Sequence, residues 1–185
     1  KELKKLNYSD TCNLRRHKKI SNYFLNQNDM RSFNVVLNDF KDAVIRTKDE
    51  KFLGKWYADK CTYFLTIGRF DLAYKYLLKA KDFSSVLLNT SYENDILLQE
   101  ILILDFYSQN LLAEKKAISL LKKSIDEGDP MEAQMNSLLA SIYNRTSRYA
   151  LAEEYYEKAI KSAGDRMEFS KDLFILTTKN NFALS

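Results

Sequence analysis

The chain of 185 residues is long enough for one ordinary domain or a run of small repeats, and too short for a large two-domain enzyme. With one Pro, four Gly, 45% hydrophobic and 29% charged residues, its composition excludes turn-rich β-sandwiches, collagen-like chains and low-complexity chains, and favours helices. The formal net charge is +4, and no apolar run reaches the ~18 residues of a membrane helix, so we expect no membrane segment.

The positive charge is concentrated near the start of the chain. Residues 1–20 hold seven Lys or Arg against two Asp or Glu, so the rest of the chain is close to neutral. We treat residues 1–12 as a basic N-terminal segment and 13–185 as a single helical-repeat domain. The cations from Arg15 to Lys19 would suit phosphates, but on a helix they spread around the axis, which favours a solvated face.

The first two predicted helices form a hairpin over residues 13–50. Apolar side chains recur at intervals of three and four residues over about 13–26 and again over 30–46, which is typical of helices with one buried face. The chain turns at 27–29, and Asp49 begins the next helix. The expected buried residues are Leu14, Ile20, Tyr23, Phe24, Phe33, Val36, Leu37, Phe40 and Val44.

Two later segments, 54–87 and 133–166, share one pattern of residues and are each expected to form a hairpin. A small residue in each helix lets the pair approach closely, and aromatic residues fill the gaps around that contact. A Gly or Ser between the helices allows a tight reversal. The matching positions are Tyr57, Cys61, Phe64, Gly68, Phe70, Ala73, Leu77 and Ala80 in the first segment and Ala140, Tyr143, Ser147, Tyr149, Ala152, Tyr156 and Ala159 in the second.

A third and less regular hairpin is expected between them, over about 94–127. Here Tyr107 stands for the first-helix aromatic residue and Ala117 for the small residue of the second helix. They are ten residues apart where the other hairpins have nine, so we expect a longer turn around 109–111. The apolar run over 96–107 favours a helix covered on several sides over a buried strand, because polar residues interrupt it.

The last stretch, 167–185, is expected to begin a further repeat, with Phe182 and Ala183 at first-helix positions. A first helix without its second helix would keep an apolar face uncovered, so we expect the native protein to continue beyond Ser185. The same reasoning leaves homo-oligomers through exposed terminal hairpins as an open alternative.

Residues that would carry catalysis or bind a metal are scarce. Cys12, Cys61 and the single His17 are too few for a structural zinc site, and no Gly-rich phosphate loop, HExxH or GxSxG motif occurs. Like charges around His17 are expected to depress its pKa, and Glu154 and Lys158 fit an exposed pair one helical turn apart. We therefore expect no enzyme, no catalytic residue, no cofactor and no metal.

The shared offsets, 8, 11, 15, 17, 20, 24 and 27 within a unit of about 34 residues, resemble the tetratricopeptide repeat (TPR) family. The resemblance implies an all-α fold, an alpha-alpha superhelix or TPR-like solenoid of antiparallel helical hairpins, whose first helices line a groove for a peptide or a protein partner. The implied groove residues are Lys55, Ala58, Thr62, Leu65 and Thr66 in one hairpin and Gln134, Ser137, Ser141, Asn144 and Arg145 in another. In the middle hairpin they are Leu98, Ile101, Asp105, Ser108 and Gln109.

The resemblance predicts a non-catalytic protein or peptide interaction scaffold, as part of a larger signalling or regulatory protein of bacterial type. Members that clamp chaperone tails use Lys and Asn where this chain has Ala58 and Thr62, so Lys55, Asn144 and Arg145 are the remaining candidates for holding a carboxylate. The alternative is a nucleic-acid-binding module that uses the basic N-terminal segment. The compartment stays open: the cytoplasm is favoured, and the periplasm is the alternative if a signal peptide precedes the chain.

Overall fold

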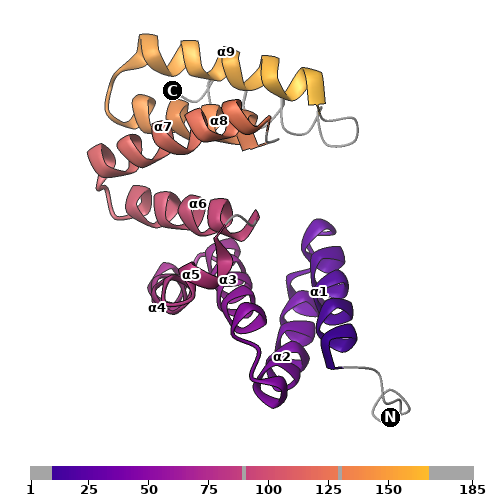
Figure 1. Cartoon of the computed structure of the whole chain (residues 1–185). Helices are drawn as coiled ribbons and strands as arrows, with labels where there is room; N and C mark the ends of the chain where they lie inside the picture. Colours follow the sequence, from indigo (N-terminus) through magenta and orange to yellow (C-terminus); the bar gives the residue numbers. More distant parts are fainter. Residues whose placement is uncertain (1–9, 89–90, 129–130, 167–185) are drawn as a thin grey trace. The chain divides into compact units, whose positions relative to one another are not determined.

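The protein is built of α-helices (Figure 1). The computed structural model describes residues 10–88, 91–128 and 131–166, and every regular element in these ranges is helical. The prediction of an all-α fold is confirmed, and the superhelical arrangement stays a prediction. Within these ranges no helix is both long and apolar enough to cross a bilayer. The helices are α1 (Asp10–Asn26), α2 (Met30–Thr47), α3 (Glu50–Thr66), α4 (Phe70–Lys81), α5 (Ser84–Leu87), α6 (Ser91–Phe106), α7 (Asn110–Glu127), α8 (Met131–Arg145) and α9 (Tyr149–Arg166).

The chain divides into two compact units, Lys1–Gln99 and Glu100–Ser185, with the boundary inside α6. In the N-terminal unit α1 packs on α2, α2 packs on α3, and α3 packs on both α4 and the short α5, which the sequence did not predict. In the C-terminal unit α7 packs on α8 and α8 packs on α9. The single domain expected over 13–185 stays a prediction, and the further repeat expected over 167–185 lies outside the described residues.

One turn geometry closes the hairpins α1–α2, α3–α4, α6–α7 and α8–α9. Each turn has a middle residue with a left-handed backbone, and we call these the turn residues: Asn28 (φ 55°), Gly68 (73°), Ser108 (58°) and Ser147 (60°). The N–H of each turn residue donates to the carbonyl three residues earlier, and the next N–H donates to the carbonyl five residues before it, at 2.8–3.1 Å. These bonds satisfy carbonyl groups that the end of the first helix would otherwise leave open.

The spacing of the turn residues defines the length of the repeat. Successive turn residues are 40, 40 and 39 positions apart, whereas a tetratricopeptide repeat has about 34 residues. Long second helices account for part of the difference in the first and third intervals, since α2 and α7 each have 18 residues. The resemblance therefore applies to offsets within a hairpin and does not extend to the distance between hairpins, and membership of the family stays a prediction.

The hairpins bury the same positions when residues are counted from the turn residue. In the second helices, the side chains 5, 9 and 12 residues after it are at most 3% exposed. In the first helices, the side chain seven residues before it is fully buried. Repeated burial at these offsets is what holds each pair of helices together. The residues are Phe33, Leu37, Phe40, Ala73, Leu77, Ala80, Ala113, Ala117, Leu120, Ala152, Tyr156 and Ala159 in the second helices, and Ser21, Cys61, Ile101 and Ala140 in the first.

The register predicted for the α6–α7 hairpin is wrong. Its turn is 107–109, as short as the other turns, so Tyr107 and Ser108 do not belong to the first helix. Ala113, and not Ala117, takes the first buried position of α7. The sequence is ambiguous here because both alanines are buried and lie one helical turn apart.

The buried face predicted for α1 is also partly wrong. Ile20 and Tyr23, expected in the core, are 36% and 60% exposed, whereas Ser21 between them is fully buried. The Ser21 hydroxyl donates to the carbonyl of Lys18 at 2.9 Å, so its polar group is satisfied inside the protein. A small residue with a local hydrogen bond therefore faces the neighbouring helix where an apolar stripe was expected.

Gly54 allows α3 to lie close to the segment that follows α4. A Cβ added at Gly54 would lie 2.7 Å from the Cβ of Phe83 and 3.0 Å from a methyl group of Leu87. Nearby, the Trp56 indole N–H donates to the carbonyl of Leu37 at 2.8 Å. Contacts on both sides thus fix the position of α3 between α2 and α5.

Candidate functional site

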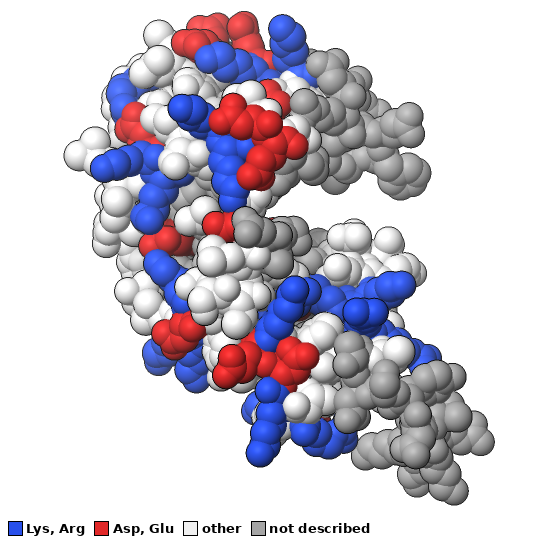
Figure 2. All heavy atoms as spheres, in the orientation of Figure 1, with Lys and Arg blue, Asp and Glu red and all other residues white. Residues whose placement is uncertain are grey.

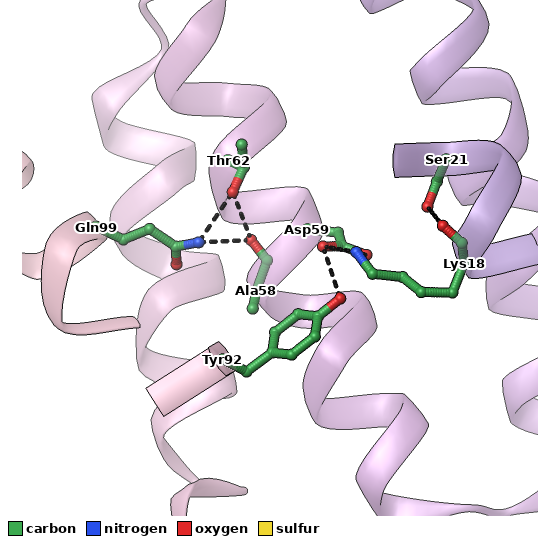
Figure 3. A network of polar contacts seen from close by, with 7 residues as sticks. All are labelled: Lys18, Ser21, Ala58, Asp59, Thr62, Tyr92 and Gln99. Carbon is green, nitrogen blue, oxygen red and sulfur yellow. Dashed lines mark hydrogen bonds and ion pairs between the residues drawn. The ribbon is translucent and has the colours of Figure 1, made fainter. Parts of the chain in front are cut away.

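A network of polar side chains joins the first helices of successive hairpins, α1, α3 and α6 (Figure 3). The Lys18 ammonium on α1 lies 2.6 and 2.7 Å from the two carboxylate oxygens of Asp59 on α3. The Tyr92 hydroxyl on α6 donates to the same carboxylate at 3.4 Å. All three residues belong to the N-terminal unit, and the Asp59 carboxylate accepts hydrogen bonds from both Lys18 and Tyr92.

Burial dominates the electrostatics of this network. Asp59 is 5% exposed, and the loss of water raises the pKa of its carboxyl group, although the charge and hydrogen bond of Lys18 act against this rise. Burial, followed by the nearby Asp59, also raises the pKa of Tyr92, which keeps its hydroxyl group neutral. Tyr92 therefore serves as a hydrogen-bond donor to the buried carboxylate.

Gln99 connects α6 to α3 beside this ion pair. Its amide Nε2 donates to the carbonyl of Ala58 at 3.0 Å and to the hydroxyl of Thr62 at 2.9 Å (Figure 3). Gln99 is 4% exposed, and its Oε1 has no hydrogen-bond partner within the described ranges. The face of α3 that carries Ala58 and Thr62 is thus covered by α6.

Lys55 lies one turn before Asp59 on α3, beside this ion pair. Its ammonium lies 5.1 Å from the ring centre of Tyr92 and 5.3 Å from that of Phe52, and it forms no ion pair with a described residue. Burial, and then the charges of Lys51 and Lys18, lower the pKa of its half-buried side chain. The charges of Asp59 and Asp49 oppose this decrease, so Lys55 is a partly desolvated cation close to two carboxylates.

The other groove residues predicted on α3 differ in accessibility. Ala58 is 1% exposed, so its side chain does not line an open groove, which corrects its expected role. Thr62 and Leu65 are half-buried and Thr66 is exposed. The Thr62 hydroxyl donates to the carbonyl of Ala58 at 3.3 Å, and the Thr66 hydroxyl donates to the carbonyl of Thr62 at 2.9 Å. Because Gln99 of α6 binds the Thr62 hydroxyl, the accessible part of the predicted set on α3 is Lys55, Leu65 and Thr66.

The groove residues predicted in the C-terminal unit lie along α8. Arg145 forms an ion pair with Asp105 of α6, so its guanidinium is engaged by a residue of the protein. Asn144, Ser137 and Ser141 are half-buried and Gln134 is exposed. In the middle hairpin the side chain of Ile101 is fully buried, Ser108 and Gln109 belong to the turn, Asp105 is bound to Arg145 and Leu98 is half-buried.

The basic run on α1 does not act as one surface. Lys18 is drawn into the Asp59 network, while Arg15, Arg16 and Lys19 stay exposed. His17 stacks on Phe40 at 6.2 Å. Burial is the largest cause that lowers the pKa of His17; the neighbouring arginines add to this effect and Asp39 opposes it. On the face seen in Figure 2, basic and acidic side chains lie next to one another at many places.

Asp59, Tyr92 and Gln99 were not predicted as site residues. One signal was present in the sequence: Asp59 stands among residues of a predicted buried helix, and a buried carboxylate requires a partner. The partner, Lys18, is 41 positions away, a separation that periodicity within one hairpin does not reveal.

No protein-family model matches this chain, and no curated protein matches it. Among the residues that the structure describes, no group of three or more His, Cys, Asp or Glu side chains is arranged to hold a metal ion. The fold and the site thus describe a protein of helical hairpins with a half-buried lysine, which has no ion pair with a described residue, beside a buried ion pair.

Proposed function

We propose that the protein is a non-catalytic interaction scaffold that binds a peptide or protein segment on the first helices of its hairpins. The observation that carries the proposal is the Lys55 ammonium, which is half-buried between two aromatic rings and has no ion pair with a described residue. Holding a desolvated charge costs free energy, and a bound carboxylate lowers that cost.

The proposed ligand group is a carboxylate from an acidic side chain or from the end of a peptide. A hydrogen bond to a charged group contributes about 1.5–3 kcal/mol, enough to dominate a weak peptide complex. Leu65 and Thr66 continue along the same helix and offer apolar and hydroxyl contacts to the neighbouring residues of the peptide. A place within a larger signalling protein rests on the family resemblance alone.

The test is an array of short peptides probed with the full chain. The array holds three sets of the same sequences: acidic side chains present, a free terminal carboxylate present, and both absent. We expect binding to the first or second set and not to the third. Lys55→Met keeps the apolar stem between the rings and is expected to weaken binding about tenfold or more. Lys75→Met, at an exposed position of α4, is the matched control and leaves binding unchanged.

Two results would contradict the proposal. One is equal binding of charged and uncharged peptides; the other is unchanged affinity in Lys55→Met. A third measurement addresses the alternative function: tight binding of a single-stranded oligonucleotide that weakens steeply with salt in both lysine variants favours the nucleic-acid module.

A further inference from the structure

The C-terminal unit contains a cavity of about 540 Å³ between α7, α8 and α9. Its apolar wall comes from α7, its base from α8, and its opposite wall from an aromatic ring and two cations of α9. The hydroxyl of Ser162 donates to Glu132 at 2.8 Å at its edge. The residues that matter for its chemistry are Leu121, Ile125, Asn136, Tyr155, Lys158 and Lys161.

The α3–α4 hairpin shows what occupies the matching positions elsewhere in the chain. The residue 11 positions before its turn residue is Tyr57, and its ring centre lies 6.3 Å from that of Tyr76 and 5.8 Å from that of Phe83. Tyr76 and Phe83 stand 8 and 15 positions after the turn residue Gly68. Three aromatic rings, from α3, α4 and the segment just after α4, thus pack together in that hairpin.

In the α8–α9 hairpin the same three positions hold Asn136, Tyr155 and Ser162, counted from the turn residue Ser147. All three line the cavity. Two of the three rings have therefore been replaced by small polar side chains, and one ring, that of Tyr155, remains. The volume that aromatic side chains fill in one hairpin is open in the other.

The cation that covers the aromatic cluster is present in both hairpins. Lys79, 11 positions after Gly68, places its ammonium 5.5 Å from the ring centre of Tyr57 and 6.0 Å from that of Tyr76. Lys158, at the matching position, lies 4.5 Å from the ring centre of Tyr155. An added ring beside Tyr155 would therefore lie close to an ammonium group, which favours aromatic faces.

Two further groups in the cavity have unused binding capacity. Asn136 is 3% exposed, and its Oδ1 has no hydrogen-bond partner within the described ranges. A buried amide oxygen left unpaired costs free energy, which a ligand that donates a hydrogen bond would offset. Lys161 forms no ion pair with a described residue, so the cavity has a cation available to an anion.

We propose that this cavity is a binding site for an aromatic carboxylate. The ring occupies the open volume beside Tyr155, and a donor on the ring or its backbone bonds to the Asn136 amide. The carboxylate lies at Lys161, because the Lys158 ammonium already binds Glu154 at 2.5 Å. Such a group is found in small aromatic acids and in peptides where an aromatic residue adjoins an acidic one. The site is separate from Lys55 and does not depend on the function proposed for it.

The test uses three related probes titrated into the ¹⁵N-labelled full chain and followed by amide chemical shifts. N-acetyl-L-tryptophan has the ring and the carboxylate, N-acetyl-L-tryptophanamide has only the ring, and N-acetyl-L-leucine has only the carboxylate. We expect shifts confined to α7, α8 and α9, with the first probe binding about tenfold or more tightly than the other two. The capped peptide Asp-Trp-Asp tests the peptide source: tighter binding than the free acid assigns the site to peptides, and weaker binding assigns it to small acids.

Variants of the cavity give the decisive comparison. Asn136→Tyr restores the residue of the α3–α4 hairpin and fills the volume, so it is expected to abolish binding with no loss of thermal stability. Lys161→Met is expected to lower the affinity for N-acetyl-L-tryptophan to that for N-acetyl-L-tryptophanamide. Lys79→Met, the equivalent of a Lys158 substitution in the other hairpin, is the control that leaves binding unchanged.

The proposal is overturned by unchanged affinity in Asn136→Tyr, or by probe-induced shifts that lie outside α7, α8 and α9. If circular dichroism shows that Asn136→Tyr does not fold, Ser162→Phe and Lys161→Met decide by the same criterion. In that case, retained affinity in both variants rejects the site.

Discussion

The two cysteines lie in opposite surroundings. Cys12 is exposed, whereas Cys61 is fully buried at the contact between α3 and its neighbours. Burial raises the pKa of the Cys61 thiol to about 12. Because the thiolate is the reactive form, a buried thiol with a raised pKa is inert.

We therefore expect a thiol reagent such as dithionitrobenzoate at pH 8 to modify one cysteine in the folded protein and the second only after denaturation. Cys12→Ser removes the fast reaction, and Cys61→Ser leaves it unchanged. Rapid modification of both thiols in folded protein would show that Cys61 is reached by solvent.

Lys55 is expected to make stability depend on pH in the alkaline range. Its pKa is lowered from 10.5 in the folded state, so between the lowered value and 10.5 the unfolded chain binds more protons at this group than the folded chain. The cost of burying the charge is full below the lowered pKa and decreases as the pH rises through it. Stability from this group therefore increases with pH in that window.

The measurement is urea unfolding of the wild type and Lys55→Met from pH 7 to 10.5. We expect the variant's advantage in free energy of unfolding to shrink as the pH rises. Lys75→Met serves as the control with no such trend. A difference that stays constant over the whole range would mean that Lys55 is fully solvated.

The candidate site could be predicted from the sequence only in part. Lys55 is one of the groove positions that the TPR resemblance implies, and its side chain is half-buried in the structure. Asp59 and Tyr92 were missed because their roles follow from a contact with Lys18 that joins separate hairpins. Burial raises the pKa of Asp59. The extent of that burial depends on contacts between helices, which the local sequence pattern does not predict.

At the scale of the element, Gly54 sets how closely α3 lies to α5. Alanine is the better helix former by about 0.5–1 kcal/mol, but the added methyl group meets the Cβ of Phe83, which cannot rotate away. We expect Gly54→Ala to lower the free energy of unfolding by about 1–3 kcal/mol, the usual cost of overpacking. Chemical denaturation measures the change.

Lys51→Ala, at an exposed position on the same helix, is the control and is expected to change stability by less than about 0.5 kcal/mol. A Gly54→Ala protein as stable as the wild type would show that α5 moves away at little cost.

Helices were predicted well because each second helix repeats its buried positions at helical spacing, and a glycine or a small polar residue marks each turn. The predicted register of α7 was wrong because Ala113 and Ala117, one helical turn apart, fit the pattern equally well. The short α5 was missed because four residues are too few for a periodic signal.

At the scale of the whole molecule, each compact unit has its own buried side chains. Phe40 is fully buried in the N-terminal unit, in a cluster that includes Leu37, Val44 and Trp56. Phe40→Ala is expected to cost about 3–5 kcal/mol there. If the units open separately, amide hydrogen exchange speeds up in α1, α2 and α3 while α8 and α9 keep their protection.

Tyr156→Ala in the C-terminal unit is the mirror control and is expected to give the reverse pattern. Equal loss of protection in both units after either substitution would show that they unfold as one cooperative body.

The interval that is one residue shorter than the others shows where this protein tolerates insertions and deletions. Lys48 and Gly128 both have left-handed backbones 20 positions after their turn residues, so α2 and α7 end in register. The buried Gly54 and Ala133 both stand 14 positions before the next turn residue, yet six positions separate Lys48 from Gly54 and five separate Gly128 from Ala133. The missing residue therefore falls between hairpins. A deletion inside a helix would rotate all later side chains of that helix by about 100° and expose a buried face. We therefore expect insertions and deletions among homologues to fall in the connections between hairpins and to leave the helices intact.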